Sequence, residues 1–160
     1  MVAYRRCEMD DYKIEAKCDV CGNNIVVDRY GNGDECSICG WRQSEEAFNH
    51  PNIAGIRNIP SLINAIKQFK DGKSATLANF QDFINALDHY GELEFTYNNT
   101  RFGVLFDDAS NKIILLNINN NQKQYYLDIN NFADNANIDG LYLKDIWQNV
   151  TNTNFLQETE

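Results

Sequence analysis

The 160-residue chain lacks long hydrophobic runs, and this absence excludes a membrane-spanning helix. No apolar stretch approaches the ~18 residues that a helix needs to cross a bilayer. The opening residues contain acidic side chains and have no apolar core of signal-peptide length, so we expect no targeting segment. A chain without such a segment is expected in the cytoplasm, where cysteine thiols stay reduced.

Histidine is also scarce, and the sequence carries no catalytic motif. The two histidines are His50, which precedes a proline, and His89, which falls near the end of a predicted helix. Neither lies close in sequence to a plausible nucleophile. The chain contains no G-x-S-x-G, Walker A, G-x-G-x-x-G or H-E-x-x-H pattern. We therefore expect a protein that is not an enzyme.

Positive charge is scarce as well, since 14 Lys and Arg face 23 Asp and Glu and give a net charge of −9. Residues 79–160 hold 4 basic and 12 acidic side chains, whereas residues 51–78 hold 4 basic and 1 acidic. Such a chain repels phosphate backbones, so we expect no direct binding of nucleic acid. An acidic face can instead attract a basic protein partner, or it can serve only to keep the protein in solution.

Five cysteines are present, and four of them form two C-x-x-C-G units. The pairs are Cys18 with Cys21 and Cys36 with Cys39, which leaves Cys7 over. A two-residue gap lets both sulfurs of one tight turn point at the same spot, and the following glycine lets the backbone direct its N–H groups at the thiolates. The spacing predicts one structural Zn²⁺ held by these four sulfurs, with Cys7 as a buried or free thiol outside the site.

Other uses of the four cysteines have to be considered. Sites of four sulfurs also hold iron in rubredoxin-like electron carriers, and the glycines fit that use. A redox C-x-x-C pair needs a thioredoxin-like βαβ context, which the sequence does not indicate. A catalytic zinc is disfavoured because four thiolates leave no position open for water. A module of about 25 residues has almost no core, so it should be unfolded without its metal.

The residues around the cysteines favour a zinc ribbon followed by a linker. A short strand is expected around residues 12–16. The β-branched run at 24–28, with a glycine-rich turn signal at 31–33, predicts a hairpin between the two cysteine pairs. Residues 43–60 contain helix breakers and are predicted to be a linker. Ser61 is a good N-cap for a helix that ends at the next Asp-Gly pair.

Beyond residue 76 the pattern predicts a helix, four strands and a second helix. The helix over 77–90 has one apolar face and a closing glycine. The apolar period then changes from 3.6 to 2, which predicts an antiparallel meander with short turns rich in Asn and Asp. The strands are expected around 93–97, 102–106, 112–118 and 122–129, and the last helix over 139–150 with Asp139 as its N-cap.

The sequence thus predicts an α+β protein with four parts. The first two are a four-cysteine zinc-ribbon module over residues 1–50 and a helical linker over 51–75. The third is a domain over 76–150 in which a helix, a four-stranded antiparallel sheet and a second helix follow one another along the chain. A frayed C-terminal tail over 151–160 completes the chain.

The cysteine motif and its flanks resemble the small bacterial cysteine-rich CPCC-type zinc modules. In that family a tryptophan follows the fourth cysteine by two residues, as Trp41 does here, and a G-x-N-x-x-S-L stretch comes after, with its counterpart at residues 55–62. The chain departs from the family at Asp19-Val20, where the family has Pro-Cys, and at Gly40, where it usually has an aromatic residue. The resemblance implies a zinc module without an activity of its own.

The second part resembles small domains of low-GC Gram-positive bacteria and their phages. The shared patterns are F-I-x-A-L at 83–87, E-F-x-Y with a later F-G at 94–103, and I-D-G-x-x-L-x-x-I-W at 138–147. In size and acidity the chain also resembles the zinc-containing anti-CRISPR proteins that act on type II-A systems. That resemblance implies an inhibitor that binds the RNA-guided nuclease of a bacterial host and blocks target DNA loading through the basic channels of the nuclease.

The resemblance supplies no contact residues, so the candidate contacts come from the acidic half of the chain: Asp82, Asp88, Glu92, Glu94, Asp107 and Asp108. Each of them can equally be a solvated surface charge. Two other functions stay open. A zinc ribbon can bind nucleic acid or the transcription machinery, helped by the basic stretch at 51–78. An antitoxin or immunity protein of a mobile element would carry the same acidic surface.

Overall fold

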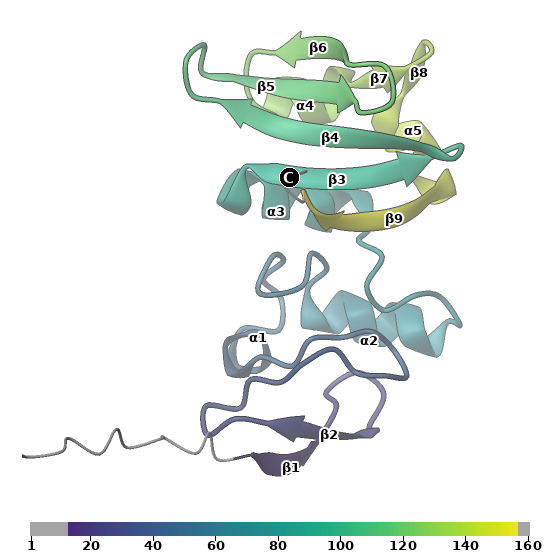
Figure 1. Ribbon diagram of the computed structural model, residues 1–160. Helices are drawn as coiled ribbons and strands as arrows, with labels where there is room; N and C mark the ends of the chain where they lie inside the picture. Colours follow the sequence, from purple (N-terminus) through teal and green to yellow (C-terminus); the bar gives the residue numbers. More distant parts are fainter. Residues whose placement is uncertain (1–12, 157–160) are drawn as a thin grey trace, which may run out of the picture.

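The computed structural model describes residues 13–156, in which short elements around the cysteines precede a larger antiparallel sheet (Figure 1). Cys7 lies outside the described residues. Among the described helices, none combines the length and the apolar character needed to cross a membrane. The elements before the sheet are β1 (Ile14–Lys17), β2 (Asn24–Val27), α1 (Glu45–Asn49), α2 (Leu62–Lys70) and α3 (Phe80–Tyr90).

β1 and β2 form an antiparallel pair whose turn contains the first two cysteines. The register runs from Ile14 opposite Val27 to Lys17 opposite Asn24. The prediction of a hairpin between the two cysteine pairs is therefore wrong about the strand that pairs with β2. That strand is β1, which precedes the cysteine motif. Only a single bridge joins Val27 to Gly33 on the other side. The tight turn at the cysteines brings its two flanks side by side, and this decides the pairing.

The helices before the sheet begin at polar caps. Ser61 caps α2 as predicted, since its Oγ accepts a hydrogen bond from the N–H of Asn64. The linker prediction missed α1, where Ser44 Oγ accepts from the N–H of Ala47 and two glutamates occupy the first turn. A serine followed by acidic residues is a usable helix-start signal. α3 begins later than predicted, after the cap residue Asn79.

The sheet has five strands and not four. Its order is β6-β5-β4-β3-β9, and every neighbouring pair is antiparallel. The first four strands follow the predicted meander: β3 (Glu92–Tyr97), β4 (Thr100–Asp107), β5 (Lys112–Asn117) and β6 (Gln122–Tyr126). The fifth, β9 (Val150–Phe155), returns from the end of the chain to pair with β3. The predicted frayed tail over 151–160 is thus wrong for residues 151–155.

The segment between β6 and β9 also differs from the predicted single helix. It consists of α4 (Ile129–Asn135), the pair β7 (Asn137–Ile138) and β8 (Leu141–Tyr142), the short α5 (Leu143–Ile146) and a 3₁₀ turn at Trp147–Asn149. Asp139 has φ of 52° and lies in the turn between β7 and β8, so it is not a helix cap. The predicted helix is cut short because the chain turns at Asp139-Gly140 and enters β9 at Val150.

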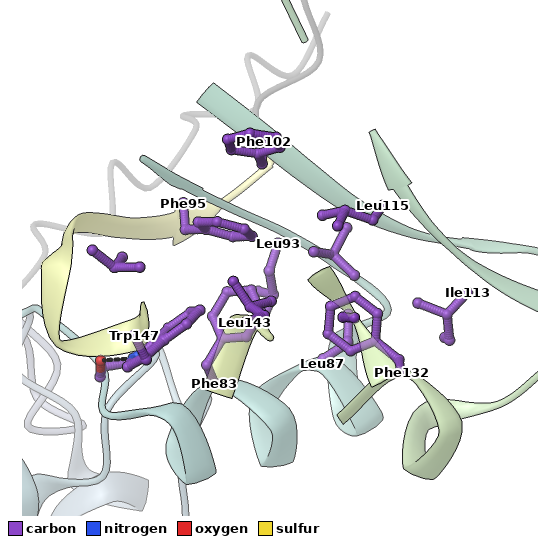
Figure 2. Packing of buried hydrophobic residues seen from close by; sticks show 14 of the residues in the cluster. Phe83, Leu87, Leu93, Phe95, Phe102, Ile113, Leu115, Phe132, Leu143 and Trp147 are labelled. Carbon is purple, nitrogen blue, oxygen red and sulfur yellow. Dashed lines mark hydrogen bonds between the residues drawn. The ribbon is translucent and has the colours of Figure 1, made fainter. Parts of the chain in front are cut away.

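The main core lies between the sheet and the three helices α3, α4 and α5, which Figure 1 shows on one face of the sheet. Phe83 from α3 packs against Phe95 from β3 and against Trp147, with ring centroids 5.8 and 4.7 Å away. Figure 2 shows these three rings together, with Leu87 and Ile113 further along the same layer. The aromatic residues that alternate along the predicted strands, such as Phe95 and Phe102, therefore belong to the core.

A second, smaller hydrophobic cluster surrounds the cysteines. It contains Cys18 and Cys36, and it extends to Leu62 and Ala65 on α2 and to Ala75. The segment predicted as a helical linker thus packs directly against the cysteine module. The division into domains stays a prediction, but residues 51–75 have a packing role that a free linker would not have.

Side-chain hydrogen bonds join the two clusters. The carboxylate of Asp82 on α3 accepts from the backbone N–H of Ser61 at 3.0 Å and from Asn64 Nδ2 at 2.8 Å. Ala78 is fixed by the end of the chain, because its N–H donates to Thr153 Oγ1 at 2.9 Å. Its carbonyl accepts from Trp147 Nε1 at 3.0 Å, and Figure 2 draws this bond at Trp147 as a dashed line. β9, the strand that sequence patterns missed, thus contributes to this region through Thr153.

Candidate metal centre

The four cysteines lie on two turns of the same construction. In the first, the N–H of Cys18 donates to the carbonyl of Asn23 and the N–H of Gly22 donates back to Cys18, at 2.8 and 2.9 Å. The second turn repeats this pattern: the N–H of Cys36 donates to the carbonyl of Trp41 at 2.9 Å, and the N–H of Gly40 donates to the carbonyl of Cys36 at 2.8 Å. Both glycines have positive φ, 75° and 76°, as the motif requires. Each turn therefore directs its two sulfurs to one side.

The two turns face each other and bring the sulfurs together. All four Sγ atoms lie within 4.8 Å of one another. The sulfurs of Cys18 and Cys39 are 3.5 Å apart, and those of Cys21 and Cys36 are 3.6 Å apart. Four sulfurs at about 2.3 Å from a central ion lie about 3.8 Å apart in a tetrahedron. The separations fit such an ion and exclude disulfides, which need about 2.05 Å.

The first cysteine of each pair is buried and the second is half-buried. Burial alone would raise the pKa of Cys36, but hydrogen bonds from the backbone N–H groups of Cys39 and Ile38, and from neighbouring thiols, lower it to about 6. Burial raises the pKa of Cys18 and of Cys39, and hydrogen bonds from the backbone offset only part of this shift. Four sulfurs this close become thiolates together only when a cation neutralises them.

Two amide side chains hold the turns against the rest of the module. Gln43 is buried, accepts from the N–H of Asp19 at 3.2 Å and donates to the carboxylate of the same residue. Burial raises the pKa of Asp19, and this hydrogen bond partly offsets the shift. Asn58 clamps the second turn, since it accepts from the N–H of Arg42 at 3.0 Å and donates to its carbonyl at 2.8 Å.

Residues 16–87 match the model of the cysteine-rich CPCC family. The matched segment contains both cysteine turns, Trp41, α2 and most of α3, and its four-cysteine cluster can bind a metal ion. The resemblance drawn from residues 18–41 and 55–62 is therefore confirmed. No curated protein and no solved structure matches the chain. The match ends at residue 87, so the resemblances over 83–150 stay predictions.

The six candidate contact residues fall into different environments. Asp82 is 4% exposed, and its carboxylate accepts the hydrogen bond from the N–H of Ser61. Glu94 is 9% exposed and forms an ion pair with Arg101 at 2.7 Å. Asp107 accepts hydrogen bonds from Ser110 and from the N–H of Ala109 within the β4–β5 turn. The hydrogen bond from Ser110 lowers the pKa of Asp107. The carboxylates of Asp82, Glu94 and Asp107 thus already bind partners within the chain.

The other three candidates share a single cavity. Asp88, Glu92 and Asp108 line an open cavity of about 540 Å³, here called the acidic groove, whose lining consists of residues 87–92, 106, 108, 111, 113 and 127–129. Asp128 also lines it, and sequence reasoning missed this residue because it stands far along the chain from the end of α3. Sheet topology brings these segments to one end of the fold.

Proposed function

We propose that the chain is a non-enzymatic zinc protein in which one structural ion folds the N-terminal module and the whole serves as a scaffold for binding another protein. The observation that carries the zinc assignment is the meeting of four cysteine sulfurs within 4.8 Å on two matching turns. Cys18, Cys21, Cys36 and Cys39 would hold the ion. When bound, zinc supplies folding free energy, about 10–16 kcal/mol of apparent binding in small modules.

A structural role is supported by the donor set and by the packing. Four thiolates fill the tetrahedral positions of zinc and leave none for a substrate or water. The cluster around the cysteines is small, so the metal substitutes for a larger core. A reducing cytoplasm keeps the thiols available. Iron in the same four-sulfur site is the alternative that metal analysis has to decide.

The test of the zinc assignment is metal analysis on the purified chain. We expect one zinc per chain and no iron. Replacement of Cys36 by serine should abolish zinc binding, whereas C7S is the matched control and should retain it, because Cys7 stands outside the motif. A metal-free chain whose cysteine module is still folded, or a C36S variant with full zinc content, would remove this part of the proposal.

For the partner we propose a basic protein surface, with the RNA-guided nuclease of a type II-A system as the specific candidate. Its support is the acidic balance of residues 79–160 and the resemblance to zinc-containing anti-CRISPR proteins. We expect a complex on co-purification and loss of target cleavage when the chain is added in excess. The absence of both a complex and inhibition at micromolar excess would exclude this partner. A salt-sensitive shift of duplex DNA by the chain alone would favour the nucleic-acid alternative.

A further inference from the structure

The acidic groove lies at one end of the main core, where α3 ends and four strands begin or end. Leu87 from α3, Ile113 from β5 and Ile129 from α4 form its apolar floor. In Figure 2, Leu87 and Ile113 lie toward the same end of the core layer. Leu87 and Ile113 are only 2% and 4% exposed, so the groove ends directly against the core without opening into it.

Apolar side chains also form the walls, and they are exposed. Tyr90 at the end of α3 is 46% exposed, Phe106 at the end of β4 is 41% exposed, and Leu127 after β6 is 69% exposed. Three separate segments thus place large apolar groups around one hollow. Single exposed apolar residues are ordinary, but a group that converges on a cavity is typical of an interaction site.

Carboxylates surround this apolar centre. Asp88, Glu92, Asp108 and Asp128 all line the groove, and none of the residues that line it is a lysine or an arginine. Among the described residues, Asp88, Glu92 and Asp108 take part in no ion pair. The C-terminal end of α3 points its negative dipole end into the same region. Within the described part of the chain, the lining therefore carries four carboxylates and no lysine or arginine.

We propose that the acidic groove binds a basic segment of a partner protein, with an apolar side chain seated on the floor and lysine or arginine side chains placed against the rim. This inference rests on the proposed protein-binding function and names the place and the chemistry of the contact. Two copies that met groove to groove would set carboxylates against carboxylates, and nucleic acid would set phosphates against them, so both are disfavoured.

A catalytic role explains the residues of the acidic groove less well than protein binding does. Its lining contains His89, whose ring lies 4.7 Å from that of Tyr90, but no serine, threonine, cysteine or lysine that the histidine could activate. The mixture of apolar walls and a charged rim matches the arrangement of protein interfaces, in which a central anchor is buried and charges stand around it.

The experiment uses the zinc-loaded full chain and short synthetic peptides in which lysines flank leucine, phenylalanine or tryptophan. Matched peptides replace the apolar residues by serine or the lysines by glutamate. Calorimetry at low salt should give micromolar binding of the lysine–apolar peptides, with both matched sets at least about tenfold weaker. Binding should also weaken as salt is raised.

Two variants locate the binding, and each has a control elsewhere on the surface. L127S removes the most exposed wall residue, and L141S removes an exposed leucine outside the groove. The triple variant D88N/E92Q/D108N removes the rim charge, and D34N/E46Q/D71N removes three exposed charges elsewhere. Each groove variant should weaken peptide binding about tenfold, and each control should stay within about twofold.

The outcomes separate this inference from the proposed function. If no lysine–apolar peptide binds, or if groove variants and controls bind alike, the groove is not the contact site. If the chain still binds and inhibits the nuclease in that case, the proposed function stands without the groove. If peptides bind as expected but no nuclease complex forms, the groove assignment stands and that partner is wrong.

Discussion

The carboxylate of Asp82 accepts a hydrogen bond from the backbone N–H of Ser61 at 3.0 Å, and this contact links the N-termini of α2 and α3. Ser61 is the cap residue of α2, and Asp82 lies in the first turn of α3. Both residues are buried, at 2% and 4% exposure. A buried polar contact thus joins α2, which packs on the cysteine module, to α3, which packs on the sheet.

The first prediction concerns this contact. D82A should lower the free energy of unfolding by about 3 kcal/mol, because it leaves the N–H of Ser61 and the amide of Asn64 without their acceptor in a buried place. Urea denaturation measures the change. D88A is the matched control on the same helix and should stay within about 0.5 kcal/mol, because Asp88 is exposed. Equal effects of the two changes would show that the Asp82 contact does not stabilise the junction.

The second prediction concerns the return of the chain end through β9. T153V removes the hydroxyl that accepts from the N–H of Ala78 and donates to the carbonyl of Thr76. We expect a loss of about 1–2 kcal/mol in unfolding free energy, since valine keeps the shape and strand propensity but leaves a buried N–H unpaired. Thermal or urea unfolding tests it.

The control for that change is T151V on the same strand, where the side chain is exposed. It should alter stability by no more than about 0.5 kcal/mol. A T153V variant as stable as T151V would mean that the strand is held by its pairing with β3 alone.

The sequence predicted the cysteine site well because the chemistry there is local. Spacing and a following glycine define each turn, and the structure places the sulfurs of both turns together. The first four strands were predictable for a similar reason, since alternation is read from neighbouring residues. The turn between β3 and β4 has positive φ at Asn98 and Asn99, as a tight hairpin requires.

The elements that sequence analysis misjudged depend on distant partners. The sequence of β9 is polar and predicts a tail. It forms a strand because it pairs with β3 and because Thr153 contacts Ala78. The partner of β2 depends on how the cysteine turn closes. The acidic groove is assembled from separate segments of the chain, so charge counts could indicate an acidic half but not which carboxylates share a surface.

The third prediction uses Tyr126, whose pKa is raised by burial although the N–H of Asn137 partly offsets the shift. Because the pKa is higher in the folded state, the neutral side chain stabilises the fold fully below the ordinary tyrosine pKa of about 10. That stabilisation is lost as the pH rises through the folded pKa. Y126F lacks the titration, so its stability should fall less steeply than that of the wild type above about pH 10.

The matched control is Y125F, one residue away on β6, where the ring is 55% exposed. Its alkaline stability curve should follow the wild type. At neutral pH, Y126F should be less stable by about 1 kcal/mol, because the hydroxyl donates to Gln124 and accepts from Asn137. Parallel curves for Y126F and Y125F above about pH 10 would contradict the assigned role of burial.

The fourth prediction concerns removal of the metal. The cysteines belong to the smaller hydrophobic cluster, whereas the sheet and the helices behind it form the larger one. Chelation of zinc should therefore unfold the cysteine module and leave the sheet folded. Hydrogen exchange should show lost protection at β1 and β2 and retained protection at β3, β4 and β5.

Falling pH should have the same local effect, because protons compete with zinc for the thiolates and the metal is released as they become protonated. Zinc added back at neutral pH restores protection in β1 and β2 if the loss was due to the metal. Retained protection of these strands without zinc would show that the module does not need the ion. Simultaneous loss across the sheet would show instead that the Ser61–Asp82 contact transmits unfolding, so that the two clusters behave as one cooperative unit.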